Sequence, residues 1–345
     1  MNLTLFINPE HDPGDDLGGR LAEHVEQVAI ARKMGYDGVA IGTHLSYGSA
    51  VWFPPFPTLM HLLPAAEGMA LSTCMLVLPF HHPLHIAEQA ALLDVACGGR
   101  FTLGLSAGWS KAEFQALGLD RATRVGRFTE SIELIRRLWT QEQVTFAGQY
   151  FQAKDLSLAL RPLRAPRPPL WVGGSVARSV QRGADVVEPL VGDTWVASSH
   201  LTEDVIADQA GVFRDRLHVQ GKPMPADFPV LRNVVVAPDR ATAWRDAGPF
   251  LAASYDVFET WGLFSDVIGK DTSHVDLEAL LAGRVVIGSP EECAEQLVRL
   301  ARATGFTRLI ARVQWMGMDQ RIVRRTIELL AEQVRPLVEA ELARH

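Results

Sequence analysis

Short apolar runs alternate with amphipathic segments along almost the whole chain, and this alternation limits the possible fold more than any other feature of the sequence. The runs that predict strands lie at residues 3–7, 38–41, 71–78, 101–105, 170–172, 184–187, 230–236 and 308–313. Segments such as 83–96 and 124–140 carry apolar residues at helical spacing. Strands that alternate with helices form parallel sheets, and about eight of them favour a closed barrel over an open sheet. We therefore predict an α/β fold of the (β/α)8 TIM-barrel class.

Two stretches interrupt this alternation. Within residues 141–169 the helical pattern stops, and two short apolar runs at 144–146 and 150–151 bracket an Ala-Gly-Gln turn, which predicts an inserted hairpin. Residues from about 253 to 284 have no sustained period, so we predict a second insertion with partly helical pieces, placed where a mobile lid could form. No repeat and no low-complexity linker divides the chain, and we expect one domain over residues 1–345.

The composition is that of a compact globular enzyme. Hydrophobic residues make up 48% and charged residues 21%, which excludes a mostly disordered chain. The net charge is −7 and the basic residues are scattered, which disfavours nucleic acid as a partner. Cys74, Cys97 and Cys293 form no metal-binding or redox motif. Because no segment approaches a membrane span and the first residues do not read as a signal peptide, we expect a cytoplasmic protein that does not bind membranes.

Candidate active-site residues directly follow the apolar runs, because a parallel barrel carries its site at the carboxyl ends of the strands. These positions are Asn8, His44 and residues 79–82, 106–109 and 173–175. They contain no pair of carboxylates and no HExxH or DxD pattern, which disfavours glycoside hydrolysis and metal catalysis. A bound organic cofactor is the better expectation.

The Gly-Gly-Ser sequence at residues 173–175 ends one predicted strand and opens the next helix. Free backbone N–H groups and a hydroxyl at a helix start suit a phosphate group. Arg124 and Arg127 could add guanidinium groups to the same phosphate. The alternative is an ordinary tight turn with Ser175 as a helix N-cap, and arginines that are solvated or paired with Glu130.

His44 follows the second predicted strand, so its side chain is expected in the barrel mouth. An imidazole there could exchange protons near neutral pH, although a single histidine is more often structural. A group of aromatic residues could either wall an apolar pocket or pack in the core. These are Trp52, Phe53, Phe56, Trp109 and Trp195.

Seven stretches that touch most of the chain carry a family likeness. In order they are AIARKMGYDGVAIGTHL, VLPFHHPLHIAEQAALLDVACGGRFTLGLSAGWSKAEFQALGLD, RVGRFTESIELIRRLWT, FAGQYF, RPPLWVGGS, VIGSPEECAEQL and VRPLVE. The second is the most specific, because it holds HP, LD, GGRF and GLSAGW in the family's relative positions. With these stretches in this order, the sequence resembles the bacterial-luciferase-like flavin-dependent oxidoreductases, which are (β/α)8 barrels.

This resemblance implies a reduced-flavin site in the barrel mouth. His44 matches the family's active-site histidine, and Cys74 with Met75 matches a bulge that has a non-prolyl cis peptide bond behind the flavin ring. Ser106 matches the position beneath the ring. The cofactor-binding positions that the resemblance implies are Cys74, Met75, Ser106, Ala107, Gly108, Arg124, Gly173, Gly174, Ser175 and Arg178.

Two positions depart from luciferase itself. Luciferase has an arginine where this chain has Ala107, so a phosphate contact would have to come from Arg124, Arg127 or Arg178. Luciferase also has a glutamate directly before the histidine, where this chain has Thr43. We therefore expect no carboxylate beside the His44 imidazole, and no light emission.

The resemblance leaves three functions open. The first is a monooxygenase that takes reduced FMN from a separate flavin reductase and uses oxygen to oxidise a small organic substrate. The second is a coenzyme F420-dependent oxidoreductase that transfers hydride without oxygen, and the third is a flavin-binding protein without turnover. The family commonly pairs barrels, which implies a homodimer, and Leu59, Leu62 and Leu63 could serve either its interface or the core.

Overall fold

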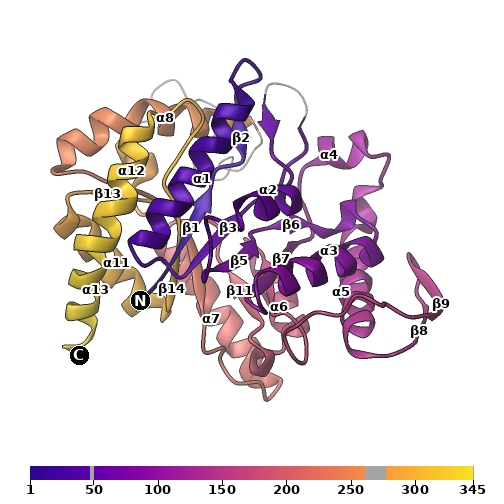
Figure 1. Cartoon of the computed structure of the whole chain (residues 1–345). Helices are drawn as coiled ribbons and strands as arrows, with labels where there is room; N and C mark the ends of the chain where they lie inside the picture. Colours follow the sequence, from indigo (N-terminus) through magenta and orange to yellow (C-terminus); the bar gives the residue numbers. More distant parts are fainter. Residues whose placement is uncertain (47–49, 261–276, 345) are drawn as a thin grey trace.

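The computed structural model describes residues 1–46, 50–260 and 277–344 (Figure 1). Its strands are β1 (Asn2–Ile7), β2 (Glu10–His11), β3 (Gly38–Ile41), β4 (Val51–Trp52), β5 (Ala70–Thr73), β6 (Leu76–Val77), β7 (Phe101–Ser106), β8 (Val144–Ala147), β9 (Gln152–Leu156), β10 (Leu170–Gly173), β11 (Thr194–Val196), β12 (Pro229–Val236), β13 (Val285–Gly288) and β14 (Arg308–Arg312). Its α-helices are α1 (Leu17–Lys33), α2 (Pro55–Leu62), α3 (Pro83–Ala96), α4 (Lys111–Ala116), α5 (Arg124–Thr140), α6 (Ala177–Val186), α7 (Glu203–Val219), α8 (Arg240–Thr260), α10 (Leu277–Leu281), α11 (Pro290–Thr304), α12 (Gln320–Leu329) and α13 (Arg335–Leu342). Short 3-10 helices lie at Leu78–Phe80, Arg121–Thr123 and Pro189–Val191, and a short π-helix lies at Leu330–Val334.

The main sheet is parallel and curls on itself. Its strands follow the order β11-β10-β7-β5-β3-β1-β14-β12-β13, so the first and last strands of the chain are neighbours. A parallel bridge between Ala197 and Val230 joins the end of β11 to β12, which closes a ring of eight strands. β13, which was not among the predicted runs, pairs with the carboxyl-terminal half of β12. The predicted parallel α/β barrel is confirmed.

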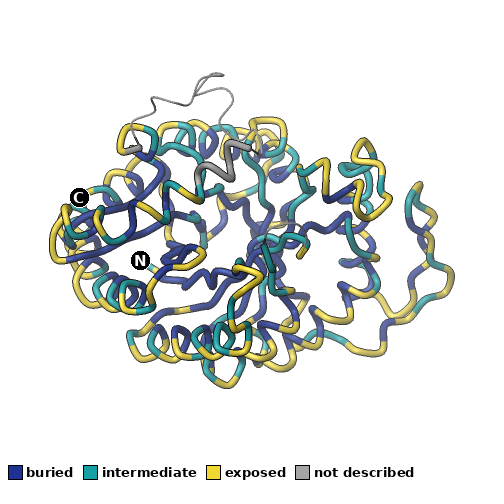
Figure 2. The backbone as a smooth tube through the Cα atoms, turned by 90° about the horizontal axis from the view of Figure 1, so that it is seen from above, coloured by how far each residue is buried: buried dark blue, intermediate teal, exposed yellow. Residues whose placement is uncertain are grey.

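Side-chain alternation along the strands builds two apolar layers. On β1, Leu3, Leu5 and Ile7 pack in the large cluster between the sheet and the helices, while Phe6 joins a smaller cluster inside the ring. Seen from above, the buried strands lie within, and the surrounding helices turn exposed residues to solvent (Figure 2). The inner cluster leaves the carboxyl ends of the strands for a cavity.

Most predicted elements lie where the sequence places them. α3 and α5 begin and end at the predicted residues. Gly35 directly follows the C-cap of α1 and has a φ of 76°, a left-handed conformation that glycine adopts without strain. The predicted hairpin is formed by β8 and β9, which pair with each other and project from the barrel (Figure 1).

The prediction of a strand at residues 184–187 is wrong. This apolar run is the end of α6, where Val180, Gly183 and Ala184 form the buried helix face. The strand that belongs to this part of the ring is β11, which follows a 3-10 turn. Three apolar residues within four positions do not distinguish a helix end from a strand, because both bury such residues.

Three further boundaries differ from the prediction. The run at 71–78 is split into β5 and β6 by a cis peptide bond between Cys74 and Met75, as the family resemblance implied. The polar residues 11–19, with their glycines and aspartates, favour a loop, but α1 already begins at Leu17. Of the predicted insertion at 253–284, the first residues continue α8 and α10 lies near its end, whereas residues 261–276 lie outside the described residues.

Leu59 and Leu62, which were considered for a dimer interface, are fully buried in the core of the chain itself. Leu63 is partly buried and packs against the same core. These leucines therefore serve folding, and any interface must use other residues.

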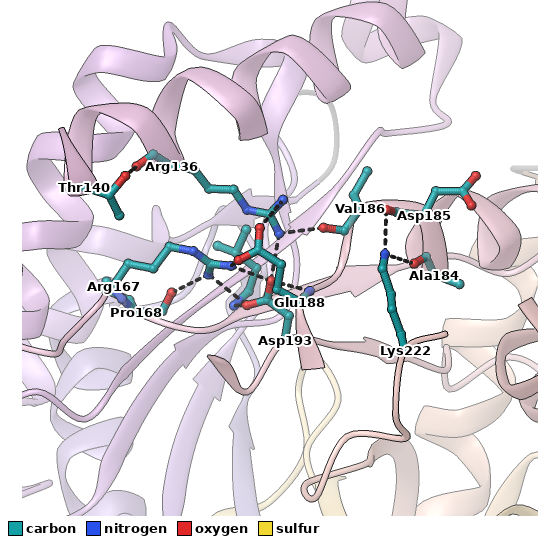
Figure 3. A network of polar contacts seen from close by, with 11 residues as sticks. Arg136, Thr140, Arg167, Pro168, Ala184, Asp185, Val186, Glu188, Asp193 and Lys222 are labelled. Carbon is teal, nitrogen blue, oxygen red and sulfur yellow. Dashed lines mark hydrogen bonds and ion pairs between the residues drawn. The ribbon is translucent and has the colours of Figure 1, made fainter. Parts of the chain in front are cut away.

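Asp193 joins the amino-terminal ends of two strands, at the opposite end of the barrel from the cavity (Figure 3). Its buried carboxylate accepts hydrogen bonds from the guanidinium groups of Arg136 (2.7 Å) and Arg167 (2.8 and 2.9 Å), and from the backbone N–H of Leu170 at the start of β10 (2.7 Å). Arg167 also pairs with Glu188 at 2.9 Å. This network fixes β10 next to β11.

Candidate active site

A cavity of about 550 Å³ opens at the carboxyl ends of the barrel strands. His44 and the ten cofactor-binding positions that the family resemblance implies all line this one cavity. These residues are His44, Cys74, Met75, Ser106, Ala107, Gly108, Arg124, Gly173, Gly174, Ser175 and Arg178. The structure thus brings together positions that lie up to 134 residues apart, as the distance in sequence from His44 to Arg178 shows. Their individual roles stay predictions.

The floor of the cavity is apolar. It is formed by residues of the cluster inside the ring, among them Phe6, Met75, Val196 and Leu231. Gly173 makes room for Met75, because a Cβ on Gly173 would lie 2.8 Å from Met75 Cγ. An apolar surface of this kind can accommodate the face of a planar ring.

Four arginines give one side of the cavity a strong positive charge. Arg121 and Arg124 come from the beginning of α5 and the turn before it, and Arg178 and Arg182 come from α6. Within the described part of the chain, none of them pairs with a carboxylate, although Arg124 donates a hydrogen bond to the Arg121 carbonyl at 3.0 Å. Burial lowers the pKa of Arg182, and the nearby charges of Arg124 and Arg178 lower it further. Such a cluster of like charges favours a bound anion.

Arg127, in contrast, does not line the cavity. Its guanidinium group lies over the rings of Tyr150 and Phe151, at 5.7 and 5.2 Å from their centres. Glu130, its suggested partner, instead accepts hydrogen bonds from backbone N–H groups of the hairpin turn, including that of Gln149 at 2.8 Å. The prediction that Arg127 contributes to an anion site is therefore wrong.

The turn at residues 173–175 leads into α6, but Ser175 is not the helix N-cap that was considered. The N-cap is Val176, whose backbone N–H donates to Ser179 Oγ at 3.1 Å, and the Ser179 hydroxyl donates to the Val176 carbonyl at 2.7 Å. The backbone N–H groups of Ser175 and Ala177 have no acceptor among the described residues. They remain available to an anion at the positive end of α6.

The expectation that no carboxylate accompanies the histidine is wrong. Glu113, from α4, places Oε1 3.1 Å from Nδ1 of His44, and the same oxygen accepts a hydrogen bond from the Leu45 backbone N–H at 2.9 Å. Glu113 is buried, with only 3% of its side chain exposed. Its place three residues after the N-cap Ser110 is the one indication in the sequence that could have identified it.

The aromatic residues divide between cavity and core. Trp52 and Trp109 line the cavity and flank His44, with ring centres 4.6 and 6.2 Å from the imidazole. Phe53 packs on the His11 ring, and Phe56 lies in the core. Trp195 is also a core residue, although its indole N–H donates to the Gly174 carbonyl at 2.9 Å and so supports the turn.

Several polar residues of the cavity carried no recognisable pattern in the sequence. Ser198 and His200 follow β11, and their side chains lie 2.7 Å apart. Arg312, at the end of β14, donates to Asn8 Oδ1 at 3.1 Å and lies 3.6 Å from the Glu10 carboxylate. Of these, the sequence singled out only Asn8.

Two other kinds of site find no support in the described residues. No group of three or more histidine, cysteine, aspartate or glutamate residues in residues 1–46, 50–260 and 277–344 is arranged to hold a metal ion. Over the same residues, no helix combines the length and apolar character that crossing a membrane requires.

Comparison with known proteins identifies relatives over nearly the whole chain. The model of a family described as luciferase-like monooxygenase matches residues 1–308. The chain is 30% identical to 4-hydroxyprotoasukamycin monooxygenase of Streptomyces nodosus subsp. asukaensis, over 97% of this chain and 92% of that protein.

Solved structures of two kinds share the fold. One is the oxygenating constituent of 3,6-diketocamphane monooxygenase from Pseudomonas putida, in complex with FMN, with a TM-score of 0.80, 21% identity, and 97% and 98% of the two chains covered. Another is an F420-dependent secondary alcohol dehydrogenase in complex with an F420-acetone adduct, with a TM-score of 0.77, 18% identity and 98% of both chains covered.

Proposed function

The chain belongs to the luciferase-like monooxygenase family, and from this premise we propose that it uses reduced FMN and molecular oxygen to oxidise a small organic substrate. One observation carries the proposal: a cationic cluster, an apolar floor and the His44–Glu113 pair meet in a single cavity. These are the three environments that a phosphate, a planar ring and a proton transfer require.

The residues present fit a flavin mononucleotide. The cavity, at about 550 Å³, falls in the size range of small-molecule and cofactor sites. The Arg124 and Arg178 side chains, together with the Ser175 backbone, would hold the phosphate at the start of α6. Met75 and Ser106 would contact the ring, with Gly173 leaving space for the Met75 side chain.

Reduced flavin, when bound, supplies the electrons with which oxygen is activated. The chain's own residues would bind the cofactor, orient the groups that transfer protons and keep water away from the reacting atoms. Glu113 accepts the hydrogen of His44 Nδ1, which fixes the ring orientation and leaves Nε2 as the nitrogen that can hold or release a proton. Trp52 and Trp109, whose rings lie next to His44 in the cavity lining, would limit the access of water to the reacting atoms.

A separate reductase is part of the proposal. The matching solved structure from Pseudomonas putida is named as the oxygenating constituent of its monooxygenase, which supports a division between an oxygenase and a flavin-reducing partner. The present chain would accordingly take up reduced FMN from solution or from such a partner. The cationic cluster, which faces the cavity, would assist capture of the anionic cofactor.

FMN is preferred over coenzyme F420 because the relative that is 30% identical is named a monooxygenase, whereas the F420-dependent structure is 18% identical. Titration of the purified protein with each cofactor, followed by absorbance, tests this choice directly. Oxygen uptake with reduced FMN, with and without candidate organic compounds, then tests oxygenation. Tight FMN binding with substrate-dependent oxygen uptake is the expected result. Selective binding of F420 would reject the proposal. So would FMN binding without an increase in oxygen uptake, above the background, on addition of any of the compounds.

A further inference from the structure

Ser198 and His200 lie on the wall of the barrel mouth that faces His44. In the ring of eight strands, β11 and β3 are four positions apart, with β10, β7 and β5 between them on one side and β12, β14 and β1 on the other. His44 follows β3 and the Ser-His pair follows β11, so the two groups stand across the ring from each other. Both line the same cavity.

Two halves of the barrel rim connect these groups, and only one of them carries the predicted cofactor-binding positions. The cationic cluster and the turn at 173–175 follow β7 and β10, on one half of the ring. The other half, over β1, β14 and β12, contributes Asn8, Arg312 and Leu231 to the cavity. Once a flavin occupies the first half, this second half remains for the substrate.

The Ser198–His200 pair is built as a hydrogen-bonding group. Ser198 Oγ lies 2.7 Å from His200 Nδ1, so the serine engages one ring nitrogen. The other nitrogen, Nε2, has no protein partner among the described residues. A neutral imidazole donates at one nitrogen and accepts at the other, and rotation of the serine hydroxyl allows either tautomer. The pair can therefore present either a donor or an acceptor at Nε2.

Two buried arginines hold this pair in place through the backbone. Arg284 donates from Nε to the His200 carbonyl at 3.0 Å, and Arg232 donates from Nη1 to the Leu201 carbonyl at 2.7 Å. Burial lowers the pKa of His200 to about 4, and the charges of Arg284 and Arg232 contribute to this shift. The ring is consequently neutral at physiological pH, and neither arginine itself lines the cavity.

We propose that Ser198 and His200 bind a hydroxyl or carbonyl oxygen of the organic substrate, on the side of the cavity opposite His44. The inference rests on the function proposed above, in that the bound molecule is the one to be oxygenated. An uncharged oxygen suits a neutral imidazole above an apolar floor that includes Val196 and Leu231. The guanidinium group on this half of the rim, Arg312, already lies 3.6 Å from the Glu10 carboxylate, which reduces its attraction for an anionic substrate.

The experiment compares probes that share one apolar body. The binding of 1-indanone, 1-indanol, indane and indane-1-carboxylate to the purified protein is measured by calorimetry, with and without FMN. The wild type should bind the ketone and the alcohol about 3- to 10-fold more tightly than indane, as expected for one net hydrogen bond. Indane-1-carboxylate should bind more weakly than either.

Variants separate recognition from structure. His200→Phe keeps a ring but removes both nitrogens, and should abolish the preference for the oxygenated probes without weakening indane. His200→Gln retains a donor and an acceptor and should keep part of that preference, while Ser198→Ala should reduce it. His85→Phe, at an exposed histidine of α3, is the matched control and should change nothing.

The inference is wrong if no probe binds, if the four bind alike, if the carboxylate binds most tightly, or if His200→Phe lowers the melting temperature but keeps the preference. FMN titration of the same variants keeps the two proposals apart. If the protein binds the ketone and the alcohol more tightly than indane through His200 but binds no flavin, the proposed function alone is rejected. Flavin binding with no such preference would reject this inference alone.

Discussion

The Glu113 carboxylate lies 3.1 Å from the imidazole of His44, although the two residues are 69 positions apart in the sequence. The buried carboxylate also accepts the Leu45 N–H, so it orients both the ring and the chain that follows it. An acid in this position fixes the ring tautomer, and with it the nitrogen that handles a proton. Both residues therefore act as one unit.

Replacement of His44 by Ala or Gln should lower substrate-dependent oxygen uptake by about 10²- to 10⁴-fold, the usual contribution of a general acid or base. Glu113→Gln should cost about 10- to 10²-fold, because the ring loses its fixed orientation, and Glu113→Asp should restore part of this loss. FMN affinity should stay within a few-fold of the wild-type value in all of these variants.

Glu133→Gln, at an exposed helix position, is the control for this prediction. Unchanged uptake in both His44 variants across pH would remove the pair from the mechanism, and lost flavin binding in a folded variant would make His44 a cofactor-positioning residue.

The arginine cluster should set cofactor affinity. Arg178→Ala and Arg124→Ala should each weaken FMN binding by about tenfold or more, because each removes a charged donor to the phosphate. The loss should shrink at high salt, which screens these contacts. Arg127→Ala is the control, because the Arg127 guanidinium group lies over the rings of Tyr150 and Phe151 and not in the cavity. Equal effects of all three substitutions would place the phosphate elsewhere.

Gly174→Val is a less specific test of the phosphate site that we propose at the turn 173–175 and the start of α6. We expect it to block approach of the cofactor to the backbone, but a Cβ at this position would also lie 2.7 Å from Ser179 Oγ. The substitution would thus disturb the start of α6 as well. The arginine variants avoid this ambiguity.

The sequence predicts the parts of the molecule that repeat a local pattern. The barrel strands other than β11, together with α3 and α5, follow from apolar periodicity. Gly35 follows from the need for a left-handed residue after α1. The family resemblance adds the cis bond between Cys74 and Met75, which no periodicity encodes. Each of these predictions needs only neighbouring residues or a familiar motif.

What the sequence does not predict depends on contacts between distant segments. Glu113 meets His44 only because α4 folds over the end of β3. His200 becomes part of the cavity because Arg232 and Arg284, from other elements, hold its loop through backbone carbonyls. Arg127 and Arg124 look equivalent in the sequence, yet the hairpin draws one of them away from the cavity. Such pairings are decided by tertiary packing, which one sequence does not display.

Asp193 should contribute strongly to stability and little to function. Asp193→Asn removes the buried negative charge that Arg136 and Arg167 share and leaves them only the half-exposed Glu188 carboxylate. It should lower the free energy of unfolding by about 3 kcal/mol in urea denaturation. Asp185→Asn, at an exposed ion pair with Arg216, is the matched control and should cost less than about 1 kcal/mol. FMN affinity should be unchanged in both, because the network lies at the opposite end of the barrel. Similar losses from the two substitutions would contradict this assignment.

A homodimer stays a prediction, and the exposed apolar residues of α2 and α3 are the surface we expect it to use. Met60, Leu92 and Val95 have 38%, 47% and 44% of their surface exposed. Light scattering should give twice the 37.9 kDa of one chain. Leu92→Arg should shift the mass to that of a monomer, whereas Leu337→Arg, at an equally exposed site on α13, should not. A monomer mass over a wide concentration range would dismiss the prediction.

Acid should destabilise the protein through His11, which is part of the small β2–β4 sheet, and through His24, whose ring centre lies 5.1 Å from that of His11. Burial lowers the pKa of His11 to about 4, with a further contribution from Arg20, and lowers that of His24 to about 3, with contributions from His11 and Arg20. Both nitrogens of His24 lack a hydrogen-bond partner among the described residues, so a proton there finds no acceptor.

The direction of the pH effect follows from these pKa values. The unfolded chain takes up protons on these rings near pH 6.5, while the folded chain does so only near pH 4 and below, so stability is complete above pH 6.5 and falls between pH 6.5 and 4. Each histidine should cost about 1 kcal/mol at pH 5.5 relative to pH 7.5. Urea unfolding of His24→Leu should show a smaller loss over this range than the wild type, and His85→Leu, at an exposed site, should match the wild type. If His24→Leu loses as much stability as the wild type between pH 7.5 and 5.5, the buried pair is not the origin of the acid sensitivity.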